Sequence, residues 1–247
     1  MKLSIAIVHA PFSSWRRANV ISIKRALNMR DHPEHSLIIE SDPGRSRSAW
    51  AVAAQAWRKC LVSSSGASHH LVMQDDVELC NNFLNGVERV VQAMPQEAIS
   101  LYGNRKDFDV AKLEVRHWIG YKDPCWGVAV ILPAEVTRDW LAWNNKYIKP
   151  EYPHDDVRLA AFLLFNDKRM WCPAPSLVEH LGAGKSLLSH KTPIVNRARW
   201  YIGSADPTAI DWVAALKNPI ITSGTSWETF YTKNQEIFKA RPEKGNV

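Results

Sequence analysis

The stretch His70-Leu71-Val72-Met73-Gln74-Asp75-Asp76-Val77-Glu78-Leu79 runs an apolar strand directly into two adjacent carboxylates. Two like charges at the end of a strand repel each other unless a cation, a hydrogen-bond network or a raised pKa relieves them. A hard divalent ion held through oxygen ligands is the usual relief, so the pair predicts a metal site. The structural alternative is helix capping, because an Asp ahead of the helix-like segment 81–92 would serve as its N-cap.

A second acidic pair, Asp155-Asp156, precedes apolar residues that repeat with helical spacing. The pair therefore opens a predicted helix, where it suits capping and the helix dipole as well as chemistry. A third element, Pro-Ser-Leu-Val-Glu-His-Leu-Gly-Ala-Gly-Lys-Ser at residues 175–186, ends an apolar run in His180 and continues into a Gly-rich turn with Lys185. An imidazole followed by exposed backbone amides suits a metal ion and the phosphates beside it.

The order and spacing of these three elements, over roughly residues 2–203, resemble the nucleotide-sugar glycosyltransferases of the GT-A fold. The resemblance implies Mn²⁺ or Mg²⁺ as cofactor and a nucleotide-sugar, in the first place a UDP-sugar, as donor. In that family the first acidic motif is often Asp-x-Asp and holds the ion against the diphosphate, whereas Gln74 occupies its first position here. The departure leaves Asp76 as the implied metal ligand and Asp75 as a contact to the ribose or donor sugar, and His180 matches the family's third metal ligand.

The same resemblance implies a mechanism. The later acidic pair supplies the catalytic base in inverting members, and the distance to Leu159 selects Asp156 for that role, with Asp155 orienting the acceptor. Lys185 and the backbone amides around Gly182 would help to stabilise the departing diphosphate. We expect a single displacement with inversion, although spacing alone does not fix the stereochemical outcome.

The chain length and the alternation of strand and helix patterns predict one α/β domain. A mostly parallel sheet flanked by helices is expected, with ligands beyond the carboxyl ends of the strands, where the first acidic pair lies. Residues 1–203 are expected to form a Rossmann-like GT-A domain and residues 204–247 a helical extension packed on it. Strands are predicted at residues 3–9, 36–40, 70–74, 99–102, 115–119 and 128–132, and helices at 17–29, 46–62, 133–144, 206–216 and 227–239.

Residues at the ends of the first two predicted strands are weaker donor-site candidates. His9, Ala10 and Pro11 stand where the resembled family usually holds the nucleotide base, and Glu40 and Asp42 stand where a carboxylate can bind a ribose hydroxyl. Ordinary loop chemistry is the structural alternative for all five.

Arg45 is a further donor candidate because its charge suits the diphosphate, although a solvated charged surface is the commoner role of such a residue. Trp126-Gly127 resembles the family's aromatic-Gly element beside the donor sugar and acceptor. A Trp face stacks well on a sugar ring, and a core Trp is the alternative.

The composition bears on the acceptor and the compartment. The chain has a formal net charge of +6 and 11 Trp, and basic residues adjoin aromatics at Trp15-Arg16-Arg17 and at residues 197–201, which include Arg197, Arg199 and Trp200. Basic side chains hold phosphates and aromatic rings stack on bases, which favours DNA with hydroxymethylated pyrimidines as the acceptor. Some bacteriophages encode enzymes that glycosylate such bases. The apolar run at residues 3–8 is too short for a signal peptide, so a cytoplasmic protein is expected.

Two other hypotheses stay open. In the first, the acceptor is a precursor of a cell-surface saccharide, so that the Trp rings stack on sugars and the charge serves an anionic donor or membrane surface. In the second, the chain is a non-catalytic module that binds a nucleotide or DNA. Gln74 in place of an acid favours that module, whereas the presence of Asp76, Asp156 and His180 together favours an enzyme.

Overall fold

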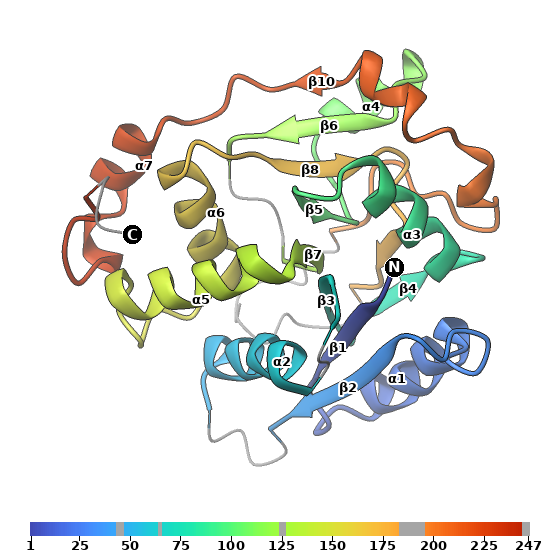
Figure 1. Ribbon diagram of the computed structural model, residues 1–247, viewed down its shortest axis with the longest axis horizontal. Coiled ribbons are helices and arrows are strands. Elements are labelled where there is room, and N and C mark those ends of the chain that lie inside the picture. The colour runs from blue at the N-terminus through green and yellow to red at the C-terminus, as the bar shows by residue number, and fades with distance from the viewer. Residues whose placement is uncertain (43–46, 64–65, 124–126, 183–195, 244–247) are drawn as a thin grey trace.

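The centre of the molecule, seen in a computed structural model, is an eight-stranded sheet with helices on both faces (Figure 1). The structure describes residues 1–42, 47–63, 66–123, 127–182 and 196–243. Neighbouring strands follow the order β10-β6-β8-β5-β7-β3-β1-β2 across the sheet. Their bounds are β1 (Leu3–His9), β2 (Ser36–Ser41), β3 (His69–Gln74), β5 (Ala98–Ser100), β6 (Trp118–Tyr121), β7 (Ala129–Pro133), β8 (Met170–Pro173) and β10 (Ile220–Ile221).

Parallel pairs outnumber antiparallel pairs in the described sheet. β1 pairs in parallel with both β2 and β3, β5 with β8, and β6 with β10. β7 runs antiparallel to both its neighbours, β3 and β5, and β6 runs antiparallel to β8. The predicted α/β class with a mostly parallel sheet is confirmed. Because β7 is reversed, its first residues lie beside the last residues of β3.

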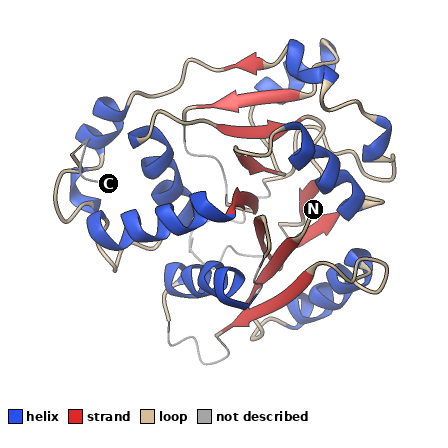
Figure 2. Cartoon of the chain, viewed as in Figure 1, coloured by secondary structure: helices blue, strands red, loops and turns tan. Residues whose placement is uncertain are grey.

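Helices cover both faces of the sheet, as Figure 2 shows. Successive residues of β3 enter two different cores: Leu71 and Met73 pack with α1 and α3, whereas Val72 packs with α2 and α5. A sheet buried on both faces needs such apolar strands, which is why β3 reads as a continuous apolar run. The helix bounds are α1 (Ser14–Leu27), α2 (Ala49–Ser63), α3 (Phe83–Ala93), α4 (Asp107–Leu113), α5 (Ala134–Tyr147), α6 (Asp155–Phe165) and α7 (Trp227–Lys233).

A small two-stranded sheet follows the first acidic pair. β4 (Val77–Leu79) runs antiparallel to β9 (Val178–His180), with Val77 opposite His180. The following helix, α3, has Asn82 at its N-cap and no acidic residue in its first turn. Capping by the first acidic pair, the structural alternative for this motif, is therefore not what the structure shows.

The C-terminal region differs from the two predicted helices. Residues 206–216 instead form the short 3₁₀ segments η1 (Pro207–Ala209) and η2 (Ala214–Lys217). The Asp206 carboxylate accepts the backbone N–H of Thr208 at 2.9 Å, and the buried Trp212 indole donates to the Pro207 carbonyl at 3.0 Å, so side chains fix this segment as tight turns.

The second predicted helix, at residues 227–239, ends early. α7 stops at Lys233 and is followed by η3 (Gln235–Ile237). Before it, β10 extends the main sheet by pairing with β6. The division of the chain at residue 203 stays a prediction. Among the described residues, every helix is too short or too polar to span a membrane.

Candidate active site

Asp75, the first acid after β3, is fully buried and both of its carboxylate oxygens are engaged. Oδ2 accepts the backbone N–H of Ala10 at 2.7 Å and lies 2.8 Å from His9 Nδ1. Oδ1 accepts a hydrogen bond from the guanidinium of Arg16. The end of β1 is thereby joined to the end of β3, which brings together three residues that the sequence assigned to the donor site.

Asp76 has a different set of contacts. Its Oδ2 accepts a hydrogen bond from Arg16 Nη2 at 2.5 Å and lies 3.3 Å from His180 Nε2. Its Oδ1 is buried and has no hydrogen-bond partner in the described part of the chain. Burial raises the pKa of Asp76, but the hydrogen bond with His180 and the charge of Arg16 outweigh that effect and hold the pKa below its ordinary value. Asp76 is therefore an ionised, buried carboxylate with one oxygen available to a ligand.

Backbone pairing places His180 beside Asp76. β9 lies against β4, and the N–H of Leu181 donates to the Asp76 carbonyl at 2.9 Å. The carboxylate of Glu179 accepts the N–H groups of His180 and Ala198, each at 2.8 Å. The proximity of the two predicted metal ligands follows from these backbone contacts and does not depend on side-chain rotamers alone.

The second acidic pair forms the first two residues of α6, as predicted. Each carboxylate accepts a backbone N–H of the residue that follows it: Asp155 Oδ1 from Asp156 at 3.0 Å, and Asp156 Oδ1 from Val157 at 2.8 Å. Burial and the neighbouring Asp156 raise the pKa of Asp155 to about 7. Burial also raises the pKa of Asp156. Raised pKa values suit carboxylates that exchange a proton near neutral pH.

Gly127 lies between Gln74, the residue before the first acidic pair, and Asp155 of the second pair. The Gln74 side chain donates to the Gly127 carbonyl at 3.3 Å, and the Gln74 N–H donates to the Val128 carbonyl at 2.9 Å. On its other side, Gly127 lies against Asp155, because a Cβ built on it would be 3.3 Å from both carboxylate oxygens. The reversed direction of β7 thus brings Gly127 to the edge where β3 ends. Trp126 lies outside the described residues.

The predicted ribose contacts at the end of β2 are already ion-paired. Buried Glu40 lies 2.6 Å from Lys59 Nζ and 2.8 Å from Arg47 Nη1, and Asp42 accepts the Arg47 N–H at 2.5 Å. Burial raises the pKa of Glu40, but Lys59 and Arg47 together lower it below its ordinary value. A ribose hydroxyl would have to share these oxygens with the basic side chains. Arg45 lies outside the described residues.

The remaining donor candidates are placed only in part. The carbonyl of Pro11 accepts a hydrogen bond from the guanidinium of Arg17. Gly182 adopts a left-handed φ of 54°, which glycine reaches without the steric cost that other residues bear. Lys185 belongs to the segment 183–195, which is outside the described residues.

The residues proposed to contact nucleic acid do not share one role. Arg199 lies 3.1 Å from the carboxylate of Asp109 and donates to the Asn104 carbonyl at 3.2 Å. Trp200 is half-buried, with its ring centroid 5.9 Å from that of His117. Arg197 is exposed. Part of the basic and aromatic character of this segment is thus used within the fold.

Sequence reasoning missed Arg16. Its neighbours Trp15 and Arg17 made it look like part of a basic, aromatic surface for nucleic acid, but the structure buries it against Asp75 and Asp76. Asn19, one helical turn later, donates to the carbonyls of Asp75 and Val77, both at 2.8 Å. The sequence position of α1 could have indicated this role. Because β1 and β3 are parallel, a helix that directly follows β1 begins near the end of β3, where the acidic pair lies.

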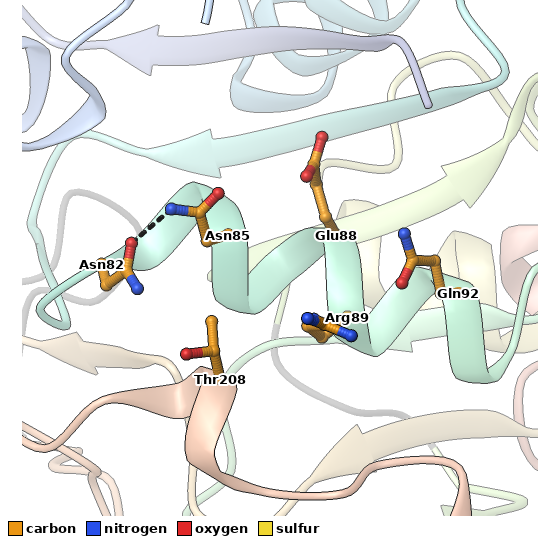
Figure 3. A pocket seen from close by; sticks show the side chains of 6 residues that line it. All are labelled: Asn82, Asn85, Glu88, Arg89, Gln92 and Thr208. Atoms are coloured by element: carbon orange, nitrogen blue, oxygen red, sulfur yellow. Dashed lines mark hydrogen bonds between the residues drawn. The ribbon is translucent and has the colours of Figure 1, made fainter. Parts of the chain in front are cut away.

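A surface depression of about 460 Å³ lies between α3 and η1 (Figure 3). No predicted site residue lines it. Its lining consists of Asn82, Asn85, Glu88, Arg89, Gln92 and Thr208.

Comparison with known proteins gives remote similarities. The sequence matches no protein-family model and no curated protein. It is similar to a glycosyltransferase involved in the glycosylation of the major capsid of PBCV-1, with 12% identity, 71% of this chain and 83% of that chain covered, and a TM-score of 0.43. It is also similar to S. aureus TarS 1–349, with 9% identity, 72% of this chain and 59% of that chain covered, and a TM-score of 0.45. A third structure is Drosophila β1,4-galactosyltransferase 7 in complex with manganese, UDP-Gal and xylobiose, with 10% identity, 77% and 82% covered, and a TM-score of 0.43.

Proposed function

We propose that the chain is a metal-dependent glycosyltransferase that moves a sugar from a nucleoside-diphosphate donor to an acceptor hydroxyl. The observation that supports it most is the position of Gly127, which accepts a hydrogen bond from Gln74, the residue before the first acidic pair, and lies against Asp155 of the second pair. Arg16 and His180 hold the pKa of Asp76 below its ordinary value, and both acids of the second pair have raised pKa values. Group transfer from a diphosphate needs both a site for cations and a group that accepts a proton.

The donor atoms beside Asp76 fit a divalent ion. Asp76 Oδ1 is buried without a hydrogen-bond partner among the described residues, and the His180 imidazole is next to the same carboxylate. Carboxylate and imidazole together suit Mn²⁺, whereas Mg²⁺ favours oxygen ligands and water. Asp76 and His180 would hold the ion, which when bound would stabilise negative charge on the departing diphosphate as a Lewis acid. Asp75 organises the β1 loop through Ala10 and His9, and its proposed ribose contact would share these oxygens.

The general base belongs to the second acidic pair. The sequence assigns it to Asp156 and gives Asp155 the task of orienting the acceptor. The contacts favour the reverse assignment, because Asp155 is the carboxylate that faces Gly127 and has a pKa raised to about 7. In either assignment, one carboxylate takes the proton of the acceptor hydroxyl, and burial raises the pKa of that carboxylate. Comparison of Asp155→Asn with Asp156→Asn distinguishes the two.

The test of the proposed function is incubation of the full chain with a panel of nucleotide sugars and Mn²⁺. An active transferase releases nucleoside diphosphate slowly even without acceptor, and this release should require Mn²⁺ and stop in Asp76→Asn. Binding of donor without any release, with every sugar and acceptor tried, would instead favour the non-catalytic nucleotide-binding module.

For the acceptor, we propose a hydroxymethylated pyrimidine in DNA. The net charge of +6 and the exposed Arg197 support it, whereas the pairing of Arg199 with Asp109 reduces the basic surface. Mass spectrometry of nucleosides from hydroxymethylated DNA, after exposure to the enzyme and mixed donors, should show a hexose or pentose adduct. The logarithm of the DNA-binding constant should fall linearly with the logarithm of the salt concentration, with a slope of close to one unit per phosphate contact. Transfer to a saccharide without any DNA binding at low salt would replace this acceptor with a cell-surface glycan precursor.

A further inference from the structure

A tight turn at the edge of the sheet opposite the acidic pairs holds two imidazoles and a carboxylate close together. It spans residues 32–35, between α1 and β2, and is closed by a hydrogen bond from the His35 N–H to the His32 carbonyl at 3.1 Å. Pro33 occupies the second position, where its fixed φ favours such a turn. The backbone therefore holds the three side chains near one another before any ligand arrives.

The potential ligand atoms of His32, Glu34 and His35 all lie within 4.8 Å of one another. Glu34 Oε1 is between the two rings, 3.8 Å from His32 Nδ1 and 3.7 Å from His35 Nδ1. A tetrahedral ion with bonds of the usual length for Zn²⁺ holds neighbouring ligand atoms about 3.4 Å apart. Small side-chain rotations would therefore close the group around an ion.

Glu88, on α3, supports this geometry from outside the turn. Its Oε1 lies 3.3 Å from His35 Nε2, a buried nitrogen with no hydrogen bond among the described residues. A carboxylate beside one ring nitrogen favours the proton there, which directs the lone pair of the other nitrogen to a metal. The N–H of Leu3 donates a long hydrogen bond to His35 Nδ1 at 3.4 Å, which identifies that nitrogen as the one with the lone pair, and a bound ion would replace this hydrogen bond. Figure 3 shows Glu88 rising from α3 on the side opposite Thr208.

We propose that His32, Glu34 and His35 bind a transition-metal ion of the Zn²⁺ type, with Glu88 orienting His35. Two imidazoles and one carboxylate suit Zn²⁺ or Co²⁺ better than Mg²⁺ or Ca²⁺, which prefer oxygen ligands. The ion would tie the turn to the start of β2 and, through His35 and Glu88, to α3. This site shares no residue with the proposed catalytic site, so each can fail without the other.

The test is titration of the full chain with Zn²⁺ by calorimetry at pH 7.5, with the absorption spectrum of bound Co²⁺ as the second readout. We expect one site that survives in the double variant Asp76→Asn, His180→Ala. His32→Ala and Glu34→Gln should each weaken it by at least about tenfold, and Glu88→Gln, which removes no ligand, by about 10- to 100-fold. Asp31→Asn, an exposed acid next to the turn, is the matched control and should bind as the unmodified chain does.

Heat denaturation gives an independent check in case one variant folds poorly. In the Asp76→Asn, His180→Ala background, which removes the other proposed ion site, Zn²⁺ should raise the unfolding temperature, because a ligand that binds only the folded state stabilises the fold. Adding Asp31→Asn to that background should leave this rise unchanged, and adding His32→Ala should abolish it. The proposal is overturned if the unmodified chain binds no Zn²⁺, or if His32→Ala and Glu34→Gln bind it unchanged. If Zn²⁺ binding is lost in the Asp76→Asn, His180→Ala double variant but kept in the turn variants, the ion belongs to the proposed catalytic site instead.

Discussion

Asp75-Asp76 and Asp155-Asp156 are the same dipeptide in two opposite electrostatic environments. The first pair is bridged by the guanidinium of Arg16, and His180 adds a further contact to Asp76. The second pair has no ion pair with Lys or Arg among the described residues, and its partners are backbone N–H groups of its own helix. Asp76 therefore stays charged, whereas burial and the neighbouring Asp156 raise the pKa of Asp155 to about 7. Environment rather than residue type thus separates the proposed cation site from the proposed base.

The largest effect should come from the pair with raised pKa values. Loss of the general base should lower turnover by about 10²- to 10⁴-fold with little change in donor or metal affinity. Asp155→Asn and Asp156→Asn, measured by steady-state kinetics and by donor binding, should differ, and the less active one identifies the base. If both variants lose only a small and equal part of their turnover, the second acidic pair does not supply the general base, and the proposed difference in role between the two pairs is wrong.

Arg16 is the cation on which the first pair depends. Breaking a buried ion pair by removing one partner costs about 3–5 kcal/mol, so Arg16→Gln should lower the free energy of unfolding by that amount in urea denaturation. The variant should also bind Mn²⁺ more tightly, because the carboxylates lose their internal countercharge. Arg17→Gln, a neighbouring change at an exposed residue, should alter stability by less than about 0.5 kcal/mol. Weaker Mn²⁺ binding in Arg16→Gln would show that Arg16 does not compete with the ion.

The metal site should respond more modestly. Asp76→Asn and His180→Ala should each weaken Mn²⁺ and donor binding by about tenfold or more, the scale of losses around metal sites. The measurement is Mn²⁺ titration by electron paramagnetic resonance in a His32→Ala background, so that the distant turn does not contribute. Glu78→Gln changes an exposed acid on β4, the strand that pairs with β9, and should have no effect. Unchanged Mn²⁺-dependent donor affinity in both site variants would remove these two residues from the metal site.

The smallest effect is a pH dependence. If Asp155 is the base, kcat/KM should be about twofold lower at pH 7 than on its alkaline plateau, and Asp155→Asn should lose this limb. Folding raises the pKa of Asp155 from an ordinary 3.8 to about 7, so the folded state holds the proton more tightly than the unfolded state. The resulting stabilisation is complete below pH 3.8 and is lost as pH rises through about 7. Urea denaturation of Asp155→Asn should show a flatter pH profile; the same slope as in the unmodified chain would contradict the assignment.

Local pattern made much of this arrangement predictable. The apolar run of β3, the acidic pair that opens α6 and the apolar residues around His180 were all visible in sequence, because each depends on burial or helical spacing within a few residues. Arg16 was not, since its pairing with Asp75 depends on how α1 returns to the sheet. The predicted helix at residues 206–216 was wrong, because side-chain contacts of Asp206 and Trp212 fix tight turns there that apolar spacing does not reveal.

The pairing of β4 with β9 also sets an order of assembly. Asp75, Asp76 and Arg16 all precede β9 in the chain, so the ion pairs between Arg16 and the two acids need only β1, α1 and β3 to form. His180 joins them only when β9 docks on β4, which closes a long loop that includes most of the intervening helices. Arg16 would therefore balance the charge of Asp75 and Asp76 before His180 reaches Asp76. The metal site would be among the last features of the fold to form.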